Sequence, residues 1–202
     1  NMVSTTANFL SNFLSGMTSA SKVSVSAMRR LIEHANPLIT SLFDPEPPLF
    51  LPAALSLSDI RIFDANFAPT DGYCLLLITE GRGFLEFTKN TAQNITKDDT
   101  DHNNFDHYSL KKYSLFFFPL SKRWRLYLEN APWKFYLFFL SGSSISYYNK
   151  LFSDSVKEPF VISGSSMLPV QLSHLYDALS NCKNDPLWLD EQLTSLLCLT
   201  IK

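Results

Sequence analysis

The feature that most constrains the fold is a series of short apolar segments between Leu49 and about Phe139. Tyr73–Thr79 is almost entirely apolar, as a strand buried on both faces is. Residues 80–83 (Glu-Gly-Arg-Gly) form a turn signal, and the alternation in Phe84–Thr88 is typical of a strand. Further strands are predicted over Tyr113–Phe118, Arg125–Glu129 and Trp133–Leu140. About six to eight short sequential strands joined by turns favour a closed antiparallel barrel or a two-sheet jelly roll.

Helical periodicity flanks this β region on both sides. The helices predicted from it cover 3–17, about 24–34, Pro37–Phe43, the stretch near 145–152, Pro169–Ser180 and Leu187–Lys202. Val161–Ser163 is expected to be a further short strand, and the proline-rich segment Asp44–Pro48 an extended linker. The sequence therefore divides into an N-terminal helical extension with its linker (1–48), a β-barrel domain (49–165) and a closing helix pair (166–202).

A polar segment, Asn90–His107, interrupts the predicted strands. Four aspartates lie in it, at positions 98, 99, 101 and 106. A segment with so little apolar material cannot bury itself, so we expect a long exposed hairpin loop.

Composition narrows the class of protein. With 46% apolar and 18% charged residues, the chain has the material for a core. Its formal net charge is −2 and its basic residues are scattered, so we expect no direct contact with duplex DNA. Cys74, Cys182 and Cys198 have no Cys-x-x-Cys spacing, which favours free thiols in a reducing compartment. No signal peptide and no run of about 18 apolar residues is present, so we expect a cytoplasmic protein without membrane contact.

The sequence shows no pattern that predicts catalysis or metal binding. A facial metal site on a barrel strand needs a His-x-His pair, and none of the four histidines forms one. Neither Ser-Gly-Ser segment has the Gly-x-Ser-x-Gly form that exposes a nucleophilic serine. Cys74 lies within an apolar strand, where burial lowers thiol reactivity. We therefore expect a protein that is not an enzyme and that uses no cofactor or metal.

Strand alternation suggests a ligand-binding face inside the barrel. Barrels of about eight strands can hold one small ligand, and aromatic rings beside a few polar groups suit a sugar or a similar molecule. The candidate ligand-binding residues are Cys74, Leu76, Ile78 and Glu80 on one strand, Trp133, Phe135 and Leu137 on another, and Trp124 and Tyr127 between them. The alternative left open is that these side chains simply fill the barrel, with Glu80 an exposed turn residue.

Three segments of the chain resemble the sensing domain of AraC-family transcription regulators. Tyr73–Gly83 resembles a strand with its Gly-x-Gly turn, and Leu110–Pro119 a strand that runs into a proline. Pro132–Gly142, with Ser144 and Tyr147-Tyr148 after it, resembles a strand with alternating aromatic residues followed by a short helix. The resemblance covers about residues 70–200.

The resemblance implies a cupin-like barrel that binds a small effector, often a sugar, and a terminal helix pair that forms a homodimer. Glu80, Trp124, Phe135 and Leu137 fall on positions associated with that family's pocket. The expected dimerisation residues are the apolar stripe Leu189, Leu193, Leu196 and Leu197. The alternative is that this stripe packs onto its own barrel.

The family reads DNA through two helix-turn-helix units that follow the sensor, and no such pattern follows Lys202. We therefore expect this chain to be the sensing half of a longer regulator. The two rival hypotheses are a cupin-fold isomerase or dioxygenase, and an interaction module whose barrel holds no effector.

Overall fold

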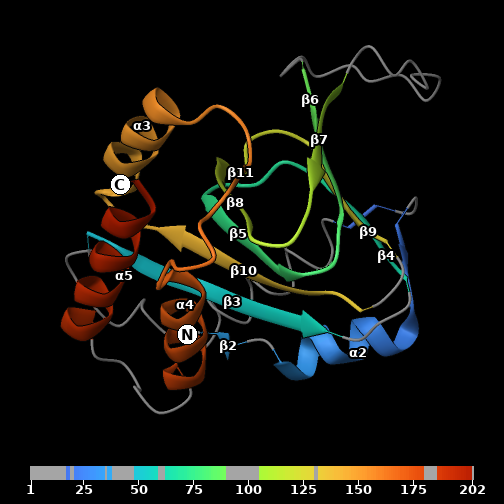
Figure 1. The fold of residues 1–202 in the computed structure, drawn as a ribbon, viewed down its shortest axis with the longest axis horizontal. Helices are drawn as coiled ribbons and strands as arrows, with labels where there is room; N and C mark the ends of the chain where they lie inside the picture. Colours follow the sequence, from blue (N-terminus) through green and yellow to red (C-terminus); the bar gives the residue numbers. More distant parts are fainter. Residues whose placement is uncertain are drawn as a thin grey trace, which may run out of the picture.

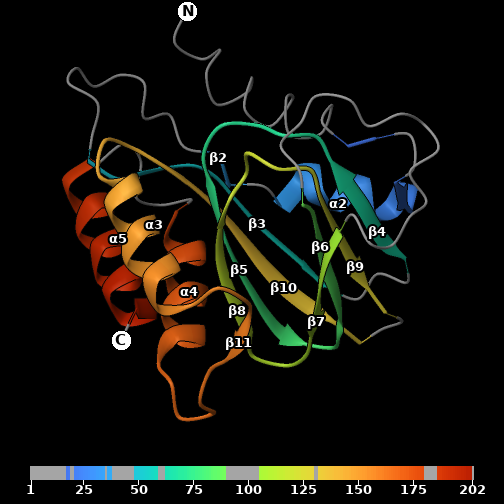
Figure 2. The ribbon, with the colours of Figure 1, turned by 90° about the horizontal axis from the view of Figure 1, so that it is seen from above.

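Two antiparallel β-sheets face each other, and helices cover the outer side of one of them (Figures 1 and 2). The computed structural model describes residues 17–18, 21–34, 36–37, 48–58, 62–89, 105–129, 132–179 and 186–201. The helices predicted over 3–17 and 37–43, the linker before Pro48 and most of the polar loop lie outside the described residues, apart from Met17 and Pro37. These two residues are not helical: Met17 forms an isolated β-bridge with Phe67, and Pro37 lies in a short strand.

The strands divide into two sheets, here called sheet A and sheet B. In spatial order, sheet A holds β1 (Lys22–Val23), β4 (Phe63–Phe67), β9 (Trp124–Leu128), β6 (Gly83–Thr88) and β7 (Phe105–Leu110). Sheet B holds β11 (Phe160–Val161), β8 (Ser114–Pro119), β5 (Tyr73–Glu80), β10 (Lys134–Ser141), β3 (Phe50–Ser58) and β2 (Asn36–Pro37). The predicted fold class is confirmed: the chain is mainly β, with two antiparallel sheets of the jelly-roll type and flanking helices.

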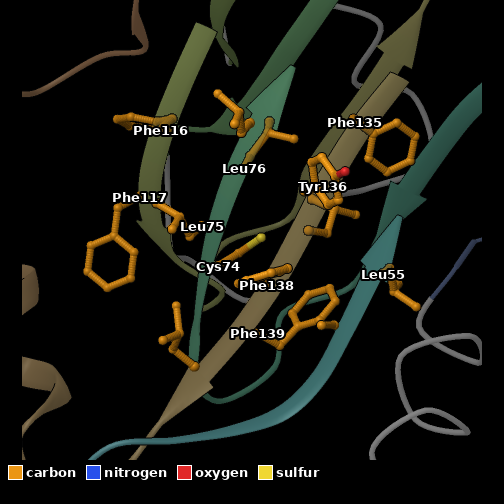
Figure 3. Close-up of a cluster of buried hydrophobic side chains, with 14 of the residues drawn as sticks. Leu55, Cys74, Leu75, Leu76, Phe116, Phe117, Phe135, Tyr136, Phe138 and Phe139 are labelled. Atoms are coloured by element: carbon orange, nitrogen blue, oxygen red, sulfur yellow. The ribbon is translucent and has the colours of Figure 1, made fainter. Parts of the chain in front are cut away.

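The inward faces of the two sheets form one aromatic core. Leu76 of β5 pairs with Leu137 of β10, so the two side chains share the inward face of sheet B. Phe118 of β8 projects from the same face and meets Trp124 of sheet A, with 5.4 Å between their ring centroids. Figure 3 shows Leu76 and its neighbours on the central strands of sheet B. Alternation along the strands therefore decides which side chains enter the barrel.

Helices α3 (Ile145–Ser155), α4 (Leu168–Ala178) and α5 (Pro186–Ile201) lie together beside the outer face of sheet B (Figure 2). Phe152 of α3 packs edge-on against Phe117 of β8 at a centroid distance of 5.6 Å. Helix α2 (Val25–His34) lies near the C-terminal end of β3. There the Arg30 guanidinium donates a hydrogen bond to the Ser58 carbonyl at 2.6 Å. These elements confirm the helices predicted near 24–34, 145–152, 169–180 and 187–202. None of the described helices is long and apolar enough to cross a membrane.

The turn between β5 and β6 depends on two glycines. Gly81 has a φ of +90°, a left-handed conformation that side chains with a Cβ rarely adopt. At Gly83 a Cβ atom would collide with the Tyr127 carbonyl oxygen on the neighbouring strand β9. The Gly-x-Gly signal therefore marks both a turn and a close backbone approach.

The structure differs from the sequence prediction in two places: the end of the predicted polar loop is a strand, and the chain before residue 49 contributes two short strands that were not predicted. Residues 105–107, assigned to the polar loop, begin β7, which pairs with β6 from Phe105 to Leu110. The alternation of β7 was hidden because its first two residues reverse it: Phe105 shares the outer face with His107, and Asp106 shares the inner face with the buried Leu110. In the N-terminal region, β1 pairs with β4 and β2 pairs with β3.

Candidate functional site

The predicted ligand-binding face of β5 and β10 does point into the barrel. Cys74, Leu76 and Ile78 of β5, like Phe135 and Leu137 of β10, are 0% exposed. The strand register brings Phe135 opposite Ile78 and Leu137 opposite Leu76. These side chains pack against one another as a core, so the described part of the barrel matches the filled alternative. Ligand binding by them stays a prediction.

The two candidate tryptophans also lie inside. Trp124 stacks on Phe67 with 4.2 Å between ring centroids. Trp133 is 0% exposed and stacks on Phe135 at 5.4 Å. Its indole Nε1 is buried and has no hydrogen-bond partner among the residues that the structure describes. Both rings therefore contribute apolar surface to the interior.

Glu80 and Tyr127 do not join the interior set. Glu80 is exposed at the end of β5, opposite Lys134 of β10. Tyr127 lies on the outer face of sheet A, where it stacks on Phe84 at 4.7 Å. In β9, residues 124 and 127 are three positions apart, so they face opposite sides of the strand. A pocket inside the barrel can therefore include Trp124 but not Tyr127.

Cys74 has the surroundings of a core residue. Burial raises the pKa of its thiol well above the usual value, so the reactive thiolate is disfavoured. Within the described ranges, no three His, Cys, Asp or Glu side chains lie together in an arrangement that could hold a metal ion.

A charged cluster that sequence reasoning missed lies on the outer face of sheet A. Arg125 donates to both carboxylate oxygens of Asp64, at 2.7 and 2.8 Å, and its Nη1 lies 3.5 Å from Glu86. Glu86 is also 2.9 Å from His107 Nδ1, and Phe84 lies under the guanidinium at 4.9 Å. The hydrogen bond with Asp64 raises the pKa of Arg125 further. Because these groups satisfy each other, the cluster joins β4, β9, β6 and β7 and leaves no open site.

A pocket lined mainly by polar side chains lies outside the barrel, on the outer face of sheet B. We call it the outer pocket. It has a volume of about 280 Å³ and is lined by Arg30, Ser56, Leu57, Ser58, Lys134, Tyr136, Ser173, Tyr176 and Asp177. These residues come from α2, β3, β10 and α4, which are far apart in the sequence. No local motif marks them, so a single sequence could not reveal the pocket.

Tyr176 forms the wall that α4 contributes to the outer pocket. Its ring packs edge-on against Tyr136 at a centroid distance of 5.8 Å. Burial raises the pKa of its hydroxyl to about 12, and a hydrogen bond with the backbone of Ser56 opposes that shift. The hydroxyl is therefore neutral at physiological pH and both donates and accepts hydrogen bonds.

The leucine stripe of α5 is buried within the single chain. Leu189, Leu193, Leu196 and Leu197 are between 0% and 5% exposed. Because α5 packs against α3, α4 and β3, the stripe matches the alternative that it is buried within its own chain. Dimerisation itself stays a prediction. The exposed apolar side chains of α5 are instead Leu187 at 82% and Leu199 at 37%.

Comparison with known proteins connects this fold to one solved regulator. The AraC-like transcriptional activator CuxR is similar over 92% of this chain and 68% of its own, with a TM-score of 0.50 and 11% identity. Weaker likenesses include oxalate decarboxylase from Bacillus subtilis (TM-score 0.27, 12% identity, 64% of this chain and 34% of that chain) and vicilin from Capsicum annuum (TM-score 0.31, 14% identity, 77% and 36%). With TM-scores below 0.5, neither of these two likenesses supports a conclusion about this chain.

No family model and no curated protein matches the sequence. At 11% identity, the likeness to the activator concerns the fold alone. The chain thus has a two-sheet barrel with C-terminal helices, and shares this fold with an AraC-like transcriptional activator.

Proposed function

We propose that this chain is a non-enzymatic, effector-sensing domain of an AraC-type transcription regulator. The observation that carries the proposal is the fold, which matches an AraC-like activator along 92% of the chain. The match extends beyond the barrel and so includes the helical part, through which a sensor would act on other units. The order of the resembling segments, from Tyr73 to Tyr148, supports the same assignment.

The effector would be a small molecule, with carbohydrates among the candidates. It would act by binding one arrangement of the barrel and its helices more tightly than another, which is the only way a ligand shifts such an equilibrium. The contact of α4 with α5 offers a route by which a change beside the barrel reaches the last helix.

The proposal includes a homodimer, formed by the exposed face of α5. Leu187 and Leu199 are the large apolar side chains on that face, and the buried leucines behind them support the helix. Contact with DNA would be made by a separate unit, in agreement with the net charge of −2 of this chain.

A thermal-shift screen tests the sensing function. The chain is heated with a panel of sugars, sugar phosphates, sugar acids, nucleotides and aromatic acids. A compound that binds the native state is expected to raise the melting temperature, by an amount that grows with its concentration. A panel without any stabilising compound would contradict the proposal.

Sedimentation tests the dimer. Leu187→Asp is expected to weaken self-association, whereas Val161→Asp, at an exposed apolar residue of β11, is the matched control and should leave it unchanged. A wild-type chain that sediments as a monomer throughout the micromolar range would contradict pairing through α5.

A further inference from the structure

The outer pocket joins three parts of the fold on the outer side of sheet B. Arg30 comes from α2, Lys134 from the barrel strand β10, and Asp177 from α4. Its volume of about 280 Å³ is close to the lower end of the range of small-molecule sites, which begins at about 300 Å³. The pocket therefore fits a small metabolite and not a peptide or a nucleic acid.

The charges of the lining favour an anion. Arg30 and Lys134 bring two positive charges and Asp177 one negative charge, so the formal balance is +1. The Lys134 ammonium lies 5.5 Å from the centroid of the Tyr136 ring and forms no ion pair with any residue that the structure describes. An ammonium in such a pocket is suited to a charge-assisted hydrogen bond with a phosphate or a carboxylate.

Hydroxyl groups make up most of the remaining lining. Ser56 and Ser58 lie on β3, Ser173 lies on α4, and the two tyrosines stand between these elements. Hydroxyls both donate and accept, so they can pair with the hydroxyl groups of a ligand. The tyrosine rings add apolar surface beside them, which suits the carbon skeleton of a polyol.

We propose that the outer pocket binds a small hydroxylated anion, with its phosphate or carboxylate group against Lys134 and its hydroxyl groups against the serines and Tyr176. The inference rests on the proposed function and deepens it, because it places the effector outside the barrel. A ligand that contacts both Lys134 of β10 and Ser173 of α4 holds α4 in one position relative to sheet B. Since α4 packs against α5, the ligand biases the helix proposed to pair with a second copy.

Calorimetric titration of the whole chain tests this site with four probes: glucose phosphate, gluconate, glucose and inorganic phosphate. Glucose phosphate or gluconate is expected to bind at one site per chain, inorganic phosphate more weakly, and glucose not measurably. Whichever of glucose phosphate and gluconate binds more tightly shows whether the site prefers a phosphate or a carboxylate. Binding is expected to weaken as salt is added, because salt screens the charge of Lys134.

Substitution of Lys134 locates the binding site. Lys134→Gln is expected to raise the Kd at least about tenfold, as loss of a hydrogen bond between charged groups does. Lys134→Arg keeps the charge and should restore part of the affinity. Lys150→Gln, on the exposed surface of α3, is the matched control and should leave the Kd unchanged. Circular dichroism and the melting temperature of each free variant show whether it is folded.

Two results would overturn the inference. One is the failure of both glucose phosphate and gluconate to bind at millimolar concentration. The other is an unchanged Kd in a folded Lys134→Gln variant. If another compound of the thermal-shift panel binds Lys134→Gln as tightly as it binds wild type, the outer pocket is not the effector site, while the sensing function stands. If no compound of the panel binds at all, both fail.

Discussion

Truncation of Leu137 tests whether the barrel interior is a packed core. Leu137 is 0% exposed and lies between Leu55 and Leu76, which are themselves at most 1% exposed and fixed by the strand register. The surrounding sheets cannot collapse into the space that Leu137→Ala creates, so the variant loses both burial and packing. We expect a loss of about 3–4 kcal/mol in the free energy of unfolding, or about 6–16 °C in melting temperature.

Urea unfolding followed by tryptophan fluorescence measures this loss. The matched control is Val25→Ala on α2, where the side chain is 78% exposed and the change should stay within about 0.5 kcal/mol. The slope of the free energy against urea should be the same in both variants, so that the midpoints report stability alone. A loss below about 1 kcal/mol for Leu137→Ala would refute the packed interior, since a residue lining an open pocket leaves little new cavity.

Three further predictions concern the turn, the thiols and the outer pocket. Gly83→Ala is expected to lower the unfolding midpoint in urea by far more than Gly164→Ala. A Cβ at position 83 would meet a carbonyl oxygen, whereas a Cβ at position 164 meets nothing within 4 Å. Equal effects of the two substitutions would contradict the close approach of Gly83 to strand β9. A thiol reagent is expected to label the exposed Cys198 before the buried Cys74, as mass spectrometry will show, and equal rates would contradict the burial of Cys74. Absorbance titration of wild type and Tyr176→Phe should assign a tyrosine ionisation near pH 12 to Tyr176, and its absence would contradict the assignment. The raised pKa stabilises the fold below about pH 10, and this contribution is lost as the pH rises through about 12.

Much of the barrel could be predicted because local signals agree there. Apolar runs bounded by glycine and proline identified β5, β8 and β10, and alternation correctly placed Leu76 and Leu137 on one inward face. The same rule places Trp124 and Tyr127 on opposite faces of β9, so the prediction that both line one pocket is wrong for Tyr127. Strand β7 was not predicted because Phe105 lies on its outer face and Asp106 on its inner face, which reverses the usual alternation, and because it follows a long polar segment.

The outer pocket and the environment of α5 could not be predicted, for a different reason. An apolar stripe shows that a helix is buried on one side but not which partner buries it, so Leu193 fits a dimer interface and a monomer core equally well. Arg30, Lys134 and Asp177 come from three separate elements, and only the packing of α2 and α4 beside sheet B brings them to one pocket. Contacts of this kind depend on tertiary structure and leave no local pattern.

In the proposed function, a small molecule controls the pairing of this chain. The most direct measurement is sedimentation equilibrium of the chain with and without the compound that raises its melting temperature most. We expect the compound to change the dimer dissociation constant by at least about fivefold, which is the lower end of the usual coupling between two sites. An unchanged constant at saturating compound would contradict this control of pairing.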